Sequence, residues 1–127
     1  MGWAWQRAGD LATAFRHRQE ALKFAAEAGY RQGETVALIG LAQDQADLGD
    51  YDTAVSTAKQ ALVVARQTRL RLLEGHALVA LASISLDRGR RADAREHAAA
   101  ALAMHRETGH VLGQSRAERL LELLGEA

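Results

Sequence analysis

The sequence predicts an all-α protein built of antiparallel helix hairpins, and three observations lead to this fold class. Ala and Leu fill 45 of the 127 positions, and Pro is absent, so the composition favours helix throughout. Aromatic residues make up only 5% of the chain, which argues against a β-sandwich or barrel. The chain also repeats with a period of 40, because 24 of 87 positions are identical when residues 1–87 are aligned with residues 41–127. Hairpins that recur in this way stack into a solenoid.

Apolar residues recur at helical spacing over about seven segments. Gly9, Gly49 and Gly89 share one repeat position and suit the left-handed end of a helix, and Asp10 and Asp50 are placed to cap the helix that follows. We expect one domain, 1–127, with a partial repeat at 1–30, repeats at 31–70 and 71–110, and a terminal helix at 111–125. The predicted helices are 3–8, 11–28, 32–48, 51–68, 71–88, 91–108 and 111–124.

Small residues recur where the two helices of a hairpin are expected to cross. Ala42, Ala54 and Ala61 would let two backbones approach closely, and Leu41 and Leu62 would fill the space beside them. One hairpin cannot bury both of its faces, so the hairpins are expected to share a continuous core.

The segment LGDYDTA at residues 48–54, followed by Ala61 and Leu62, resembles the core of a tetratricopeptide (TPR) repeat. The period is 40 rather than 34, and Arg66 and Arg106 stand where the family usually has Pro. Both departures suit the TPR subclass with longer helices and 40-residue repeats. The junctions at 28–38 and 108–113 also resemble the junctions of that subclass. This style is similar to the C-terminal TPR arrays of actinobacterial SARP-type transcriptional regulators.

The resemblance implies a TPR-like right-handed superhelical solenoid that binds a protein or peptide. It implies a regulatory region of a larger bacterial transcriptional regulator, so we expect this chain to be a fragment whose partner is another protein or another domain of the same chain. The alternative is a structural self-association module, in which Trp3, Trp5 and the leucines at 120–124 form a homo-oligomer through the exposed ends of the array.

In TPR proteins the first helix of each hairpin lines the concave surface. Positions of these helices that turn away from the predicted core differ between repeats, as expected if they select a ligand. The carboxylate clamp of some TPR domains needs Asn, which is absent here, and Lys23 and Lys59 both fall on second helices. The expected partner-binding residues are Trp3, Arg7, Val36, Ile39, Gln43, Asp47, His76, Val79, Ser83, Asp87, Arg116 and Arg119.

The residue pattern argues against catalysis, metal binding and cofactors. Cys is absent, which excludes disulfides, zinc fingers and thiol nucleophiles. The five histidines lack the spacing of a compact metal site and are expected at the surface. No nucleophile elbow or phosphate-binding loop occurs. Neighbouring carboxylates, such as Asp44 with Asp47 and Asp50 with Asp52, are not expected to do acid–base work, because Asp50 suits a cap and Asp52 at a helix start favours the dipole.

Charge and hydropathy argue against nucleic acid and membrane as partners. The net charge is zero, and the arginines between Arg88 and Arg95 alternate with acidic residues and have no aromatic neighbours for stacking on bases. No apolar run approaches the roughly 18 residues that a membrane helix needs. We therefore expect a cytoplasmic protein.

Overall fold

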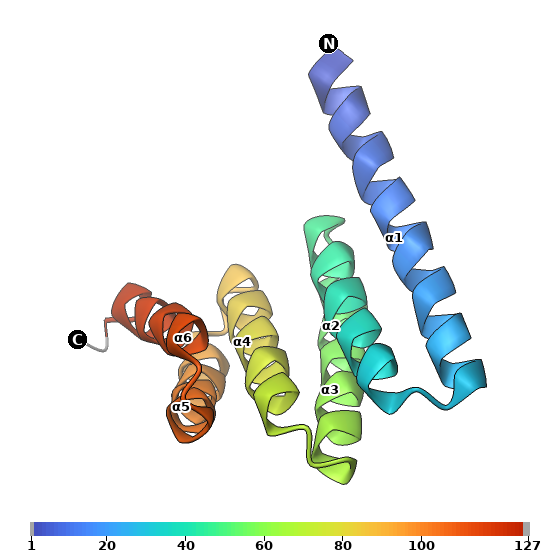
Figure 1. Ribbon diagram of the computed structural model, residues 1–127. Helices are drawn as coiled ribbons and strands as arrows, with labels where there is room; N and C mark the ends of the chain where they lie inside the picture. The colour runs from blue at the N-terminus through green and yellow to red at the C-terminus, as the bar shows by residue number, and fades with distance from the viewer. Residues whose placement is uncertain (1, 126–127) are drawn as a thin grey trace.

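The computed structural model describes residues 2–125, with side chains from residue 9 onward, and over this range the chain forms six helices and no strand (Figure 1). The predicted all-α class is confirmed. Five of the helices begin and end within one residue of the predicted bounds. In chain order the helices are α1 (Gly2–Ala28), α2 (Arg31–Asp47), α3 (Tyr51–Gln67), α4 (Arg71–Asp87), α5 (Arg91–Thr108) and α6 (Val111–Leu123).

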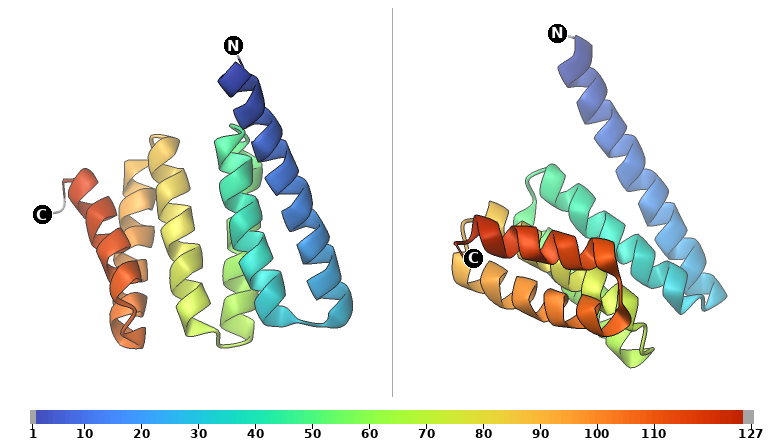
Figure 2. Two further views of the ribbon diagram at one scale, coloured as in Figure 1. Left: turned by 45° about the horizontal axis from the view of Figure 1, so that its top comes forward. Right: turned by 60° about the vertical axis from the view of Figure 1, so that its left-hand side comes forward.

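The predicted break at Gly9 is wrong, because α1 is one continuous helix. Asp10 consequently lies inside the helix and is not a cap. The N-terminal half of α1 extends beyond the ends of the other helices (Figures 1 and 2).

The turns repeat with the same period as the sequence. The backbone enters the left-handed region at Gly29, Arg69 and Gly109, which are 40 residues apart, and again at Gly49 and Gly89. Gly49 therefore ends α2 as predicted. The Asp50 side chain accepts a hydrogen bond from the Thr53 backbone N–H at 3.4 Å, which confirms the predicted cap of α3.

The helices stack in two layers. Figure 2 shows α2, α4 and α6 side by side in front, with α3 and α5 behind them. Each helix contacts the next along the chain, and α4 also contacts both α2 and α6. A polar contact recurs between hairpin ends: Arg31 donates to Gln67 at 3.0 Å, and Arg71 donates to Glu107 at 2.5 Å. The architecture is an all-α helical repeat.

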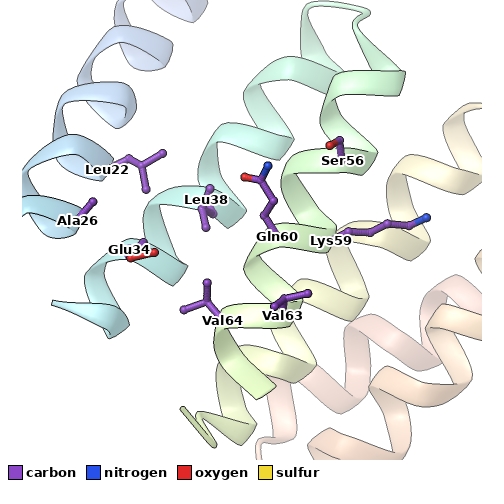
Figure 3. A pocket seen from close by; sticks show the side chains of 9 residues that line it. All are labelled: Leu22, Ala26, Glu34, Leu38, Ser56, Lys59, Gln60, Val63 and Val64. Atoms are coloured by element: carbon purple, nitrogen blue, oxygen red, sulfur yellow. The ribbon is translucent and has the colours of Figure 1, made fainter. Parts of the chain in front are cut away.

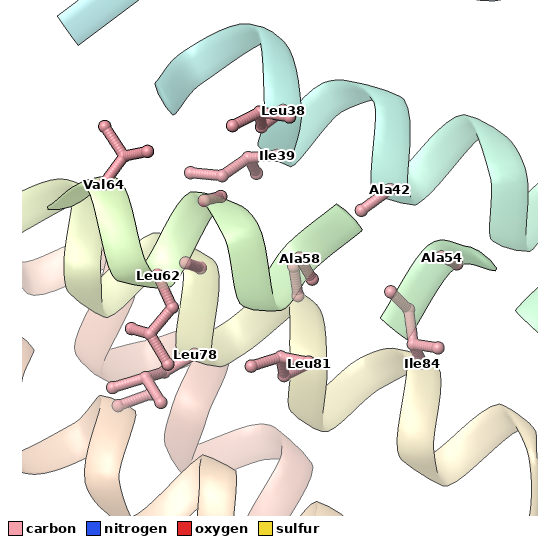
Figure 4. Packing of buried hydrophobic residues seen from close by; sticks show 14 of the residues in the cluster. Leu38, Ile39, Ala42, Ala54, Ala58, Leu62, Val64, Leu78, Leu81 and Ile84 are labelled. Carbon is pink, nitrogen blue, oxygen red and sulfur yellow. The ribbon is translucent and has the colours of Figure 1, made fainter. Parts of the chain in front are cut away.

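The core lies between the layers and uses small residues where helices cross (Figure 4). Ala54, Ala58 and Ala61 on α3 are fully buried, and Leu81 on α4 fills the space beside them. This packing explains how the fold forms with few aromatic residues. None of the helices between residues 2 and 125 is both long enough and apolar enough to cross a membrane.

Candidate functional site

Half of the expected partner-binding residues converge on one hollow of about 380 Å³. It is formed by the layer of α2, α4 and α6, and Ala46, Ala80 and Ile84 give it an apolar floor. Residues that are far apart in sequence are thereby brought together by the stacking of equivalent helices. The predicted residues that line it are Gln43 and Asp47 from α2, Val79, Ser83 and Asp87 from α4, and Arg116 from α6.

The charge in this hollow is uneven. Asp47 and Asp87 occupy equivalent repeat positions, are both exposed, and form no ion pair with any residue whose side chain is described. Arg116 also lines the hollow. Two carboxylates beside an apolar floor can accept hydrogen bonds from a Lys or Arg side chain of a bound segment.

The other expected residues lie elsewhere. Val36 is 51% exposed but outside the hollow, and Arg119 lines a separate hollow on α6. Ile39 is only 8% exposed, so its expected place on an open surface is wrong. It belongs to the apolar cluster between the layers (Figure 4). The expectations for Trp3 and Arg7 fall outside the side chains that the structure describes.

The outer face of α6 is polar at positions where the preceding first helices are apolar. Glu118 corresponds by the 40-residue period to Leu78, and Glu122 corresponds to Ala82. Both acidic residues are exposed, and with Arg119 they line a hollow of about 370 Å³. The leucines at 120–124 mostly face inward: Leu124 is 3% exposed, and only Leu123, at 59%, points largely to solvent.

A larger hollow of about 650 Å³ lies between α1, α2 and α3 and was not expected from the sequence (Figure 3). Leu22, Leu38 and Val64 give it apolar walls. At the equivalent place in the next repeat, Arg66 forms an ion pair with Glu74 at 3.1 Å. The residue equivalent to Arg66 is Ala26, which cannot form this pair. The 40-residue period aligns Ala26 with Arg66, so the sequence alone could have indicated that this ion pair is missing beside α1.

Three histidine rings meet where α4, α5 and the start of α6 come together. The ring centroids of His76 and His105 are 5.1 Å apart, those of His76 and His110 are 5.0 Å apart, and those of His105 and His110 are 5.3 Å apart. His105 is fully buried, so its expected surface position is wrong. The spacing of histidines along the sequence does not predict this cluster, because His76 lies on α4 and reaches the other two rings only through the packing of α4 against α5 and α6.

The histidine cluster disfavours protonation. Burial, followed by the neighbouring His105 and His110 and then Arg116, lowers the pKa of His76 to about 4. Burial and His110 also lower the pKa of His105, against a smaller opposing effect of the Gly75 backbone. Neither ring nitrogen of His105 makes a hydrogen bond of good geometry, and the nearby Gly75 backbone offsets the effect of burial only in part.

The cluster is not arranged as a metal centre. Over the described part of the chain, no group of three or more His, Asp or Glu side chains is placed to hold a metal ion. The Nδ1 of His110 already accepts a hydrogen bond from the Gly113 backbone N–H at 2.9 Å. The proton of the neutral ring must therefore sit on Nε2, so neither nitrogen has a free lone pair for a metal.

Comparison with known proteins assigns no family. The sequence matches no protein-family model and no curated protein. The candidate site therefore rests on the repeat register and on the side chains that it brings together.

Proposed function

We propose that this chain is a scaffold for protein or peptide binding, and that the hollow formed by α2, α4 and α6 is its ligand site. The observation that carries the proposal is the convergence of Gln43, Asp47, Val79, Ser83, Asp87 and Arg116, which come from three stacked helices. The corresponding positions Gln43 and Ser83 differ in type, as a ligand-selecting surface would.

The chemistry of the hollow favours a basic segment as the ligand. Asp47 and Asp87 present two carboxylates without ion-pair partners among the described side chains, and the partly exposed Ala46 and Val79 provide apolar surface beside them. A helix or extended peptide that carries Lys or Arg next to a small apolar side chain would satisfy both surfaces. No reaction is proposed for this hollow.

The proposal extends to the biological role that the TPR resemblance implies. In this role the chain is the regulatory region of a larger cytoplasmic transcriptional regulator of bacterial type, and its ligand is a protein or another domain of the same chain. Nucleic acid contact would then belong to another module. The gene sequence on either side tests this, since a winged-helix or ATPase module in the same reading frame would support it and an unrelated flanking region would contradict it.

Self-association through the end of the array is the weaker alternative. This alternative rests on Trp3, Trp5 and the leucines at 120–124. Leu124 is buried and Leu120 and Leu121 are partly buried, and the side chains of Trp3 and Trp5 lie outside the part that the structure describes. The outer face of α6 instead carries Glu118 and Glu122.

The ligand site is tested by selection of peptides on the wild-type chain. Displayed random peptides should be enriched in Lys and Arg, and an enriched peptide should lose at least tenfold in affinity for the double variant Asp47→Asn, Asp87→Asn. Both changes keep the side-chain shape and remove the charge. Affinity is measured by fluorescence anisotropy at 50 mM and 200 mM salt.

The matched control is Asp93→Asn, which removes one exposed carboxylate from α5, outside the hollow. It should leave the affinity unchanged. If the selected peptides bind the double variant and the wild type equally, the hollow is not the ligand site. If the selection yields acidic peptides, the assignment of a basic ligand is wrong.

A further inference from the structure

We propose that His76, His105 and His110 form a proton-operated latch, which holds α6 against α4 and α5 while the rings are neutral and loosens it when they are protonated. The proposal rests on the geometry of the three rings and on the hydrogen bond that begins α6. It does not depend on the ligand proposed above.

His110 makes the latch sensitive to protons because it is the N-cap of α6. Its Nδ1 accepts from the Gly113 backbone N–H at 2.9 Å. Protonation would turn Nδ1 into a donor and abolish this hydrogen bond. It would also place a positive charge at a helix N-terminus, where the helix dipole disfavours it. Tyr30 and Leu70 stand at the equivalent positions and make no side-chain cap, so the device belongs to α6 alone among the three first helices.

His105 connects the start of α6 to α4, because its ring lies against residues of both helices. Its ring is fully buried and is pressed between two glycines: a Cβ on Gly75 would lie 2.6 Å from the ring, and one on Gly113 would lie 2.5 Å from it. The equivalent positions of the other repeats hold Ala25 and Ala65. The ring thus fills a space left by Gly75 of α4 and Gly113 of α6, and neither of its nitrogens makes a hydrogen bond of good geometry.

The charges around the cluster oppose protonation. From α6, Arg116 lowers the pKa of both His76 and His105. On α4, Glu74 is paired with Arg66, and on α5, Glu107 is paired with Arg71. No carboxylate contributes to the shift of either ring. The first ring to be protonated is therefore repelled by Arg116, and a second protonated ring is repelled by the first as well. Separation of α6 from α4 and α5 relieves this repulsion.

Hydrogen exchange followed residue by residue by NMR tests the latch. Protection factors, which remove the intrinsic pH dependence of exchange, are measured at pH 7.5 and pH 5.0. We expect the amides of α6 to lose at least tenfold more protection than the amides of α3 on acidification. Parallel loss in both helices would mean that acid unfolds the whole chain, and it would overturn the proposal.

Two variants separate the latch from a general effect of acid. His110→Asn keeps an acceptor at the cap but does not titrate in this range, so α6 should stay protected at pH 7.5 and lose most of its pH response. His17→Asn changes an exposed histidine of α1 and should leave the response intact. A full pH response in His110→Asn would refute a latch at the cap.

Metal binding is distinguished in the same experiment. Addition of EDTA at pH 7.5 should leave the protection of α6 unchanged, as expected if neutral rings alone hold the helix. A fall in protection with EDTA that zinc restores would mean that a metal ion holds the three rings, and the proton latch would be wrong.

Discussion

Arg69 is the only non-glycine residue between positions 2 and 125 with a positive φ, at 57°. The same turn position is held by Gly29 and Gly109 in the adjacent repeats. A side chain with a Cβ in this region costs roughly 1 kcal/mol or more, because the Cβ approaches the following carbonyl oxygen. The turn thus retains its shape in the middle repeat in spite of an unfavourable residue, since the helices on both sides impose it.

Arg69→Gly should stabilise the chain by about 1 kcal/mol, because it removes this steric cost. Part of the gain is offset by the greater backbone freedom of Gly in the unfolded state. Urea denaturation followed by circular dichroism measures the change. Arg69→Ala is the matched control: it also removes the exposed Arg side chain but keeps the Cβ, so it should not stabilise. Equal gains in both variants would assign the effect to the charge of Arg69 and not to its backbone.

At the scale of single residues, the sequence predicted a structural feature only where the cause of that feature is local. Asp50 caps α3 and Gly49 ends α2 as their residue types indicate, because both effects act within one turn of helix. The burial of His105 was not predictable in this way. It results from Gly75 and Gly113, which lie on two other helices and leave room for the ring.

At the element scale, α1 is joined to α2 by an ion pair that the other repeats replace with apolar contacts. Arg18 contacts Asp44 at 2.7 Å, and the Asp44 side chain is only 7% exposed. The equivalent residues are Ala58 and Ile84, which are both buried. Burial raises the pKa of Asp44, although Arg18 acts in the opposite direction. The raised pKa means that the ionised carboxylate is less favourable in the folded chain than in the unfolded chain.

Arg18→Ala should destabilise the chain by about 1–3 kcal/mol, because it leaves a buried carboxylate unpaired. The double variant Arg18→Ala, Asp44→Ile copies the α3–α4 contact and should regain this loss or exceed wild-type stability. Urea midpoints at pH 7.5 provide the comparison. If the double variant is no more stable than Arg18→Ala, the two contacts are not equivalent and the register between α1 and α2 is not that of the repeat.

The bounds of α2 to α6 were predictable because each helix is flanked by a turn residue and has apolar spacing of its own. α1 was not, because the sequence at Gly9 and Asp10 is the same as at Gly49 and Asp50, where the chain does turn. The difference is tertiary: α2 and α3 pack on each other on either side of the turn at Gly49, whereas the residues before Gly9 continue α1 and form no such hairpin. A glycine permits a turn, but packing of the two flanking helices makes the turn favourable.

At the scale of the whole molecule, the repeat register predicted which residues line the hollow of α2, α4 and α6, but it did not predict which other positions of these helices are buried. Positions 43, 47, 79, 83, 87 and 116 converge because equivalent helices stack in one layer. Ile39 fails because α2 is covered on two sides, so one of its apparently outward positions is buried. The hollow between α1 and α3 was not predictable from apolar spacing, since it depends on how far apart two helices lie that do not follow each other in the chain.

The stability of the whole chain should depend on pH through one buried histidine, His105, and two partly buried ones, His76 and His97. The pKa of His76 is lowered to about 4, and burial also lowers the pKa values of His97 and His105. In the unfolded chain a histidine has a pKa of about 6.5. Between these values the unfolded chain binds more protons than the folded chain, so the free energy of unfolding must fall as the pH falls. Asp44 acts in the opposite sense at lower pH, because its raised pKa lets the folded chain take up a proton first.

We therefore expect the free energy of unfolding to be nearly constant above pH 7 and to fall by about 1–3 kcal/mol between pH 6.5 and pH 4.5, allowing for the partial solvent exposure of His76. Urea titrations at pH 8, 7, 6, 5 and 4.5 measure this curve. His76→Gln removes one titrating ring, so the variant should lose less stability than the wild type over this interval. His17→Gln, which changes an exposed ring, should follow the wild-type curve. If His76→Gln also retains the full slope, the acid sensitivity comes from groups outside the cluster, and His76 is not held neutral by its neighbours.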